Sequence, residues 1–248
     1  MISYCQKTGL ILNNEKTQLM VSTRKKFEVK IGSCLVIGKP EITILGVDYD
    51  TNFTTSPYLK KLACEAQTRA ALIHRLSFGM PPHLLITFAN GLLMGKILAA
   101  APATIPIRID PEDMGSITIT EQINKSIKSC ACSIARIKLL DKVRSEVVLA
   151  KAGLRCLNEV VTSAMAILTW KSKQLMNPLG VRLFSLRNNM INTRSAESKN
   201  ICAPVPGFQT IPINLMARIW NKVPGLQTAT TVGEAKTFVK KWARTTPR

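Results

Sequence analysis

The hydrophobic pattern of the chain changes its period once, near residue 56, and this change restricts the fold more than any other feature. Before it, Phe27-Glu28-Val29-Lys30-Ile31 alternates strictly between apolar and polar residues, which is typical of a half-buried strand. After it, apolar residues recur about every three to four positions, which is typical of helices with one buried face. The sequence therefore predicts an α+β fold that is mostly α.

The part before residue 50 is expected to be a small antiparallel β-meander that follows a short helix ending at Gly9. Gly32-Ser33 fits a two-residue hairpin turn. Pro40 should end the strand at 34–37, because proline has no backbone N–H to donate to a sheet. The predicted strands cover residues 18–23, 27–31, 34–37 and 42–47.

Helices are expected to dominate from residue 56 onward. Ser56 is a suitable N-cap and Pro57 suits the first helical position, while Thr120 and Asn158 are further candidate caps. The second helix is apolar nearly all round, which predicts that it is buried. The predicted helices cover about 57–78, 83–100, 120–137, 143–152, 158–175 and 232–243, with a loop over 102–116. These patterns divide the chain into a β-rich part at 1–55, a helical domain at 56–176 and a basic, partly disordered C-terminal segment at 177–248 that carries the short terminal helix.

The charge of the chain points to a polyanionic partner. Lys and Arg number 34 against 15 acidic residues, giving a net charge of +19. Such an excess attracts DNA, RNA or an anionic membrane surface, and it is greatest after residue 170. The most apolar stretch, 84–105, is interrupted by Asn90 and Lys96. It therefore favours a buried helix over a membrane span, and no membrane partner is expected.

The cysteine pattern gives no support for a metal site. The seven cysteines are irregularly spaced, no C-x-x-C pair occurs, and the two histidines are distant from the close pair Cys130 and Cys132. Cys64 and His74 are ten residues apart on one predicted helix, too far to act as a nucleophile and its base. Reduced thiols of this kind are typical of an intracellular protein, in the nucleus or the cytoplasm.

Several segments, in order, resemble the C-terminal part of non-LTR (LINE-like) retrotransposon reverse transcriptases. The stretch Thr8-Gly9-Leu10-Ile11-Leu12-Asn13-Asn14-Glu15-Lys16-Thr17-Gln18-Leu19-Met20-Val21 resembles the segment after the catalytic aspartates of such enzymes, where a "G-L-x-L-N-x-x-K-T" run closes the palm. Ile44-Leu45-Gly46-Val47-Asp48-Tyr49-Asp50 is similar to their "L-G-V-x-x-D" primer-grip hairpin. Further similarity lies in Phe53 and Pro57 with the basic helix up to Arg75-Leu76, and in Arg218-Ile219-Trp220-Asn221 with Val223-Pro224, which resembles the closing "W-N-x-L-P" motif.

The resemblance implies that 1–55 is a palm remnant and that 56–176 is thumb-like. It also implies a partner, a template–primer duplex of RNA or DNA. Leu45, Gly46 and Val47 would shape the primer grip. Lys16 would be a vestige of the lysine that acts on the leaving pyrophosphate. The duplex phosphates would be held by basic residues that lie largely off the apolar face of helix 57–78, namely Lys60, Lys61, Arg69 and Arg75.

Catalysis by this chain alone is not expected. Polymerases of this family hold two Mg²⁺ ions with paired aspartates, and no two aspartates are adjacent in the 248 residues. Asp48 and Asp50 are interpreted as solvated charges of the hairpin. We therefore expect a truncated reverse transcriptase that binds nucleic acid, with no cofactor of its own although the parent enzyme would use Mg²⁺. The alternatives are an unrelated basic helical module that binds nucleic acid or protein, and a membrane-associated helical protein.

Overall fold

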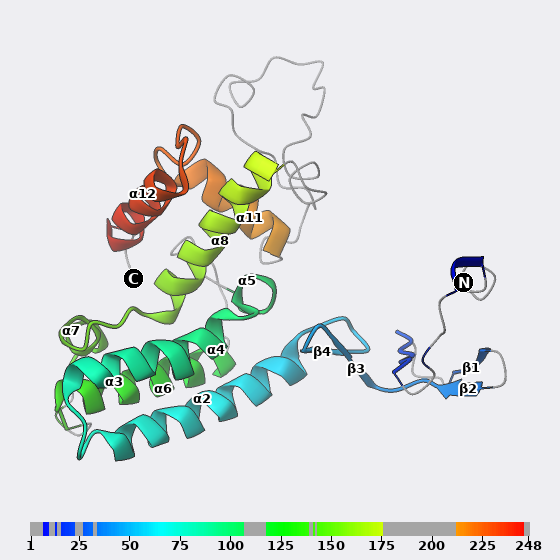
Figure 1. Cartoon of the computed structure of the whole chain (residues 1–248), viewed down its shortest axis with the longest axis horizontal. Helices are drawn as coiled ribbons and strands as arrows, with labels where there is room; N and C mark the ends of the chain where they lie inside the picture. The colour runs from blue at the N-terminus through cyan, green and yellow to red at the C-terminus, as the bar shows by residue number, and fades with distance from the viewer. Residues whose placement is uncertain are drawn as a thin grey trace. The chain divides into compact units, whose positions relative to one another are not determined.

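Short strands before residue 51 and helices from residue 56 onward confirm the expected α+β, mostly α fold (Figure 1). The structure is a computed structural model, which describes residues 7–9, 13, 16–22, 27–31, 34–106, 118–138, 141, 143–175 and 212–245. The chain divides into two compact units, Met1–Lys61 and Leu62–Arg248. Residues 107–116 of the loop predicted at 102–116, and most of the expected basic segment, 177–211, lie outside the described residues.

The strands of the N-terminal unit form two separate hairpins, so the expected single meander is wrong. Strand β1 (Glu28–Ile31) pairs antiparallel with β2 (Cys34–Ile37), and β3 (Glu41–Ile44) pairs antiparallel with β4 (Val47–Asp50). The two sheets share no strand. Pro40 stands between β2 and β3, where its missing N–H and fixed φ end the first hairpin before the second begins.

The strand predicted at 18–23 is also wrong over its described residues, 18–22. Only Leu19 forms a bridge, a parallel one with Gly38, and the backbone N–H of Lys39 donates to Leu19 O at 2.8 Å. The side chain of Gln18 instead accepts the backbone N–H of Thr43 at 3.1 Å. An apolar run alone therefore did not make a strand here, because a strand needs a partner along its length.

Helix α2 (Ser56–Leu76) follows the second hairpin and begins within one residue of the predicted start, but Ser56 is its first helical residue, so the predicted N-cap is wrong. Pro57 occupies the first turn, and the N–H of Leu59 donates to Thr55 O at 2.9 Å. One face of the helix is buried at the predicted spacing of three and four residues, confirming the apolar stripe: Leu59, Leu62, Ala63, Ala66, Ala70 and Ile73.

The expected continuous buried helix at 83–100 is interrupted. Helix α3 (Pro82–Phe88) begins at a proline as predicted, but it passes into a π-helix, η1 (Ala89–Met94), before α4 (Gly95–Leu98). Gly91 and Gly95 lower the helical preference of this segment. The segment is not buried all round either, because Leu84 and Phe88 are 43% and 41% exposed.

Four further helices extend the C-terminal unit: α5 (Ala101–Thr104), α6 (Thr118–Ala135), α7 (Ser145–Lys151) and α8 (Leu157–Leu175). Helix α5 occupies the first part of the expected loop. Helices α6 and α8 begin before Thr120 and Asn158, so these residues lie inside the first turn and the predicted N-caps are wrong. Four of the five residues expected in the core stripe of α6 are buried, at Ile123, Ile127, Cys130 and Ile134, whereas Ile137 lies beyond the end of the helix and is half-buried.

The last two helices pack against α8 (Figure 1). Helix α12 (Val232–Thr245) was expected, whereas α11 (Pro212–Lys222) was not. Leu215 and Ile219 of α11 are fully buried, and the indole Nε1–H of Trp170 in α8 donates to Ala229 O at 3.0 Å. Residues 212–245 are therefore part of the folded C-terminal unit.

None of the described helices combines the length and the apolar character that crossing a membrane requires.

Candidate nucleic-acid interface

The three residues expected to form a primer grip lie at the tip of the β3–β4 hairpin. Ile44 pairs with Val47, so Leu45 and Gly46 are the two turn residues, and both have positive φ, 51° and 82°. This is the pattern of a type I′ turn, whose twist matches that of the strands. The sequence predicted one strand over 42–47, and the turn corrects that prediction. Val47 is buried, whereas Leu45 is fully exposed.

Leu45 is an unusual residue for this turn. A bulky L-residue in the left-handed region is strained, by about 1–3 kcal/mol, and type I′ turns prefer Asn or Gly there. Backbone strain of this kind often marks a functional position. The hairpin thus places an apolar side chain in solvent at an energetic cost that Asn would avoid.

The carboxylates beside this turn are held by local hydrogen bonds. The Thr43 hydroxyl donates to Asp48 Oδ1 at 2.7 Å. Asp50 accepts the backbone N–H groups of Asn52 and Thr54 and, at 2.6 Å, the Thr54 hydroxyl. The Thr54 hydroxyl and N–H bonds lower the pKa of Asp50, because they favour its charged form. In the part of the chain that the structure describes, no three His, Cys, Asp or Glu residues are grouped so that they could hold a metal.

Lys16 lies in an exposed turn. Its backbone N–H donates to Asn13 Oδ1 at 3.1 Å, and the Thr17 hydroxyl donates to Asn13 O at 2.8 Å. These bonds fix the backbone of the turn and leave the Lys16 ammonium group in solvent.

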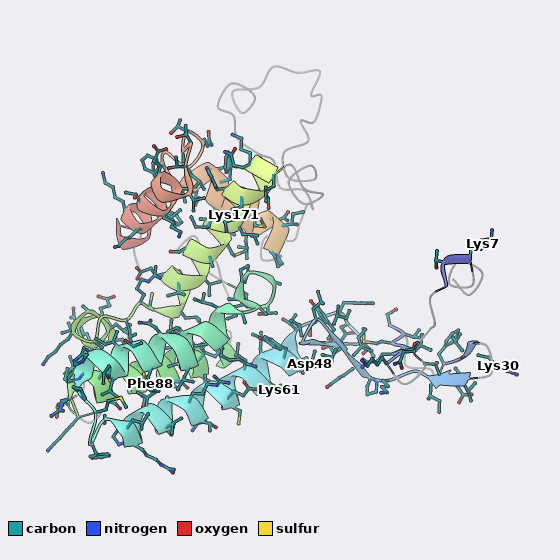
Figure 2. All side chains as sticks on the ribbon, viewed as in Figure 1. Lys7, Lys30, Asp48, Lys61, Phe88 and Lys171 are labelled. Atoms are coloured by element: carbon teal, nitrogen blue, oxygen red, sulfur yellow. The ribbon has the colours of Figure 1, made fainter. Side chains whose placement is uncertain are left out.

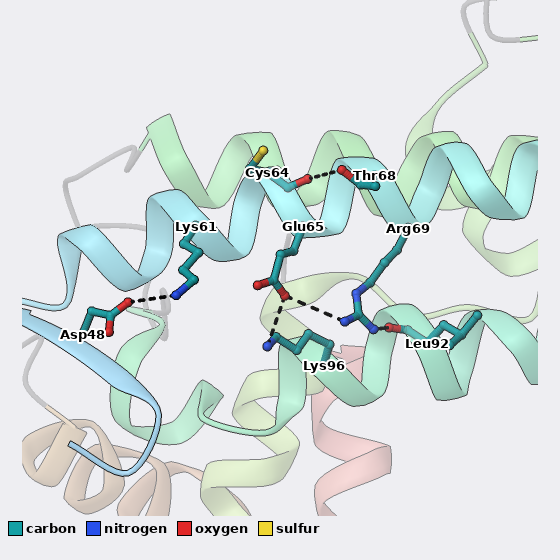
Figure 3. Close-up of polar contacts among 8 residues, drawn as sticks. All are labelled: Asp48, Lys61, Cys64, Glu65, Thr68, Arg69, Leu92 and Lys96. Carbon is teal, nitrogen blue, oxygen red and sulfur yellow. Dashed lines mark hydrogen bonds and ion pairs between the residues drawn. The ribbon is translucent and has the colours of Figure 1, made fainter. Parts of the chain in front are cut away.

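The cations at the start of α2 differ in their surroundings. Lys60 is exposed, and no ion pair of its side chain occurs among the described residues. Lys61 Nζ lies 3.5 Å from Asp48 Oδ2 (Figure 3). The Lys61 side chain is 67% exposed, so this pair is worth at most about 1 kcal/mol and can exchange for a phosphate.

Arg69 lies off the buried stripe, as expected, but its guanidinium group is engaged by other residues of the chain. Its Nη1 donates to the backbone oxygen of Leu92 in η1 at 2.6 Å, and its Nη2 lies 3.8 Å from Glu65 Oε2 (Figure 3). Lys96 Nζ lies 3.1 Å from the same carboxylate oxygen. Glu65 Oε2 is shielded from solvent and makes no well-directed hydrogen bond, so the two cations hold it by charge. This cluster fastens α2 to η1 and α4.

The remaining predicted cation, Arg75, is exposed near the end of α2. The neighbouring His74 connects α2 to α6, with its Nδ1 3.0 Å from the Ser133 hydroxyl oxygen, and its ring packs edge-on against Phe78. Of the four cations predicted on this helix, Lys60 and Arg75 are therefore available to a ligand without breaking an ion pair within the described part of the chain.

The cysteines of the C-terminal unit are separate thiols. Cys64 is exposed on α2, whereas Cys130 and Cys132 are buried in α6. Burial raises the pKa of Cys130 to about 12, because a thiolate loses its hydration there. Cys130 is therefore a neutral core side chain at physiological pH, as its place on the apolar stripe suggests.

Exposed lysines that the sequence analysis did not single out lie on α8, namely Lys171 (Figure 2), and on α12, namely Lys236 and Lys240. The available signals were the excess of basic residues after 170 and the helices predicted at 158–175 and 232–243, which contain these lysines. Comparison of the chain with models of protein families, with curated proteins and with solved structures finds no match.

Proposed function

We propose that the chain is the C-terminal part of a reverse transcriptase of the non-LTR retrotransposon type and that it binds template–primer nucleic acid through phosphates. The order of its similar segments supports this proposal: Thr8–Thr17, Ile44–Asp50, Phe53 with Pro57, and Arg218–Pro224. Each motif alone is unspecific, and the proposal rests on their combination.

The observation that carries the proposal is the β3–β4 hairpin directly before a basic helix. In the family, the "L-G-V-x-x-D" segment is a hairpin that grips the primer, and here the similar segment forms a tight turn with Leu45 fully exposed and strained. Gly46 leaves the backbone at the tip open to close approach, since nothing stands within 4 Å of its missing side chain. Both features suit contact with a nucleic-acid strand.

The charge supports binding that is independent of sequence. With a net charge of +19, the chain can neutralise several phosphates and release their counterions. If about six phosphates are neutralised, the affinity should fall on the order of a thousandfold between 50 and 200 mM salt. Contacts of this type position a duplex without reading its bases.

Polymerisation by this chain alone is not part of the proposal. In-line transfer of a nucleotide needs two metal ions that stabilise the attacking and leaving oxygens. The 248 residues contain no pair of adjacent aspartates. The carboxylates of Asp48 and Asp50 accept hydrogen bonds from the hydroxyls of Thr43 and Thr54. Lys16, even if it descends from a catalytic lysine, would have no reaction to assist here.

The test combines binding and extension on one substrate. The purified chain is titrated into a labelled RNA–DNA primer–template duplex at 50, 100 and 200 mM salt, and deoxynucleotides with Mg²⁺ or Mn²⁺ are then added. We expect salt-dependent binding without sequence preference and no extension above a mock preparation. Absence of binding at 50 mM salt would overturn the proposed binding, and template-dependent extension would show that a metal site has been missed.

A second candidate is a basic helical module with no descent from a polymerase. It is favoured by the folded C-terminal unit, Leu62–Arg248, which carries most of the cations independently of the hairpin. The genomic sequence upstream of the Met1 codon distinguishes the two. A reading frame, intact or broken, that encodes an Ala-Asp-Asp turn within a few dozen codons supports the reverse-transcriptase origin.

A further inference from the structure

The three helices α8, α11 and α12 form the most one-sidedly charged part of the described structure. They pack together in the C-terminal unit, α11 and α12 both against α8 (Figure 1). Their only acidic residues are Glu159 and Glu234, against eight basic residues: Lys171, Lys173, Arg218, Lys222, Lys236, Lys240, Lys241 and Arg244.

Neither acid neutralises the lysines on the outside of α12. Glu159 is buried in the first turn of α8. Glu234 lies in the first turn of α12, where its Oε2 accepts the N–H and hydroxyl of Thr230, both at 2.9 Å, and the N–H of Thr231 at 3.4 Å. These bonds direct the carboxylate toward the backbone at the start of the helix.

Helix α12 presents a basic stripe. Its apolar face is buried, with Ala235 and Val239 at 0% and 1% exposure. Lys236 and Lys240 each follow one of these residues, are exposed and stand one turn apart, and Arg244 occupies the next turn of the same helix. A rise of 1.5 Å per residue places successive positions about 6 Å apart along the axis, so each lysine can approach a different phosphate of one strand.

Two of the four basic residues of α2 are less available to a ligand than those of α12, whereas Lys60 and Arg75 resemble Lys236 and Lys240 in having no ion pair among the described residues. Lys61 and Arg69 already have carboxylate partners, and Arg69 would also have to give up its hydrogen bond to Leu92. Lys236 and Lys240 have no ion pair among the described residues, so a phosphate that approaches them displaces only water and mobile ions. This release of counterions drives association with nucleic acid.

We infer that the outer face of α12, with Lys236 and Lys240 at its centre, is a phosphate-binding surface for the nucleic-acid backbone, separate from the β3–β4 hairpin. This inference rests on the proposed function for the class of ligand. A nucleic acid fits better than a lipid surface, because an amphipathic helix binds membranes by inserting its apolar face. In α12 that face is already covered by α8.

The experiment uses the full chain and three matched proteins: the wild type, Lys236→Gln/Lys240→Gln, and the control Lys125→Gln/Lys151→Gln. Lys125 and Lys151 are exposed on α6 and α7, so the control removes the same charge from other helices. Glutamine keeps helical propensity, and circular dichroism and thermal unfolding verify that both variants fold. Binding to a primer–template duplex, to single-stranded DNA and to vesicles containing phosphatidylserine is measured from 50 to 200 mM salt.

The α12 variant should lose roughly tenfold in duplex affinity at 50 mM salt, and its slope of log K against log salt should be shallower by about 1.8, or 0.9 per lost phosphate contact. The control should lose clearly less. If the wild type binds the duplex and the two variants are equal, the α12 surface is wrong and the proposed function stands. If the wild type binds no nucleic acid, both fail, and binding to the vesicles alone assigns the surface to a membrane.

Discussion

At the scale of single residues, the fold places two apolar side chains where they are both strained and exposed. Leu45 and Phe53 have φ of 51° and 56°, and their exposed fractions are 101% and 65%. Hydrogen bonds between Asp50 and Thr54 hold the loop that contains Phe53. A folded chain keeps such positions only if the surrounding contacts enforce them, so they are natural targets for substitution.

Leu45→Asn should stabilise the hairpin and weaken its proposed grip. Asn accepts the left-handed conformation that a type I′ turn requires, so the gain should be about 1 kcal/mol. Hydrogen exchange of the Ile44 and Val47 amides should slow accordingly, while affinity for a primer–template duplex should fall because the exposed leucine is gone. Faster exchange of these amides in the variant would show that the leucine conformation is not strained.

Arg69 and Arg75 should differ in their contribution to stability although both are basic residues of α2. The Arg69 side chain is about one-third exposed, and Arg69→Gln removes its charged hydrogen bond to Leu92 O. This loss should lower the free energy of unfolding by about 1–2 kcal/mol. Arg75→Gln, at an exposed position, should stay within about 0.5 kcal/mol of the wild type. Urea unfolding measures both, and equal losses would contradict the contact between α2 and η1.

At the scale of elements, α12 carries its own start signal. Thr231 and Glu234 form a capping box, since the N–H of Glu234 donates to Thr231 Oγ1 at 3.2 Å and Glu234 Oε2 accepts the N–H of Thr231. The T-x-x-E spacing could have been found in the sequence. Gly225, with φ of 80°, lets the preceding loop pass close to α12, because a Cβ atom there would stand 2.8 Å from the ring of Phe238.

The capping box gives α12 a pH-dependent stability with a defined sign. Hydrogen bonds from Thr230 lower the pKa of Glu234. The stabilisation by its carboxylate is therefore fully present above the ordinary glutamate pKa and is lost as the pH falls through the lower pKa of the folded state. Glu234→Gln should therefore unfold more easily than the wild type at pH 7, and the difference should shrink in strong acid. Thermal unfolding at several pH values measures this.

Thr231→Ala provides the control for the same cap. It should lose about 1 kcal/mol without this acid dependence, because a hydroxyl does not titrate in this range. A Glu234→Gln variant whose destabilisation is independent of pH would contradict the role assigned to the carboxylate.

At the scale of the whole molecule, the C-terminal helices complete the core around α8. Ile219→Ala should destabilise the C-terminal unit by about 2–5 kcal/mol, because Ile219 is fully buried. Leu175→Ala, at a position 72% exposed on α8, should change little. Denaturant unfolding followed by tryptophan fluorescence compares the two. If Ile219→Ala is as stable as Leu175→Ala, α11 is not docked on α8.

The same packing limits how the binding surfaces can be separated. A chain cut near residue 177 would lose α11 and α12 and leave buried residues of α8, such as Trp170, in solvent. Point substitutions at Lys60 and Arg75 on one helix, and at Lys236 and Lys240 on another, distinguish the two surfaces without removing part of the core.

The sequence by itself determined what depends on neighbours a few residues apart. The change of period near residue 56, the buried stripe of α2 and the start of α3 at Pro82 follow from local spacing and from the fixed backbone of proline, so they were predictable. The class of the fold follows from the same periodicity, whereas the net charge of +19 is only the feature on which the proposal of a polyanionic partner rests.

Tertiary structure alone decided which strands pair, which helices dock and which cations stay free. Arg69 finds the carbonyl of Leu92, 23 residues away, and Glu65 finds Lys96, while Lys236 and Lys240 meet no acid among the described residues. Four strand-like segments are equally compatible with one sheet or two, and α11 buries one face against α8. Such partners are distant in sequence, and their contacts depend on packing that no local pattern encodes.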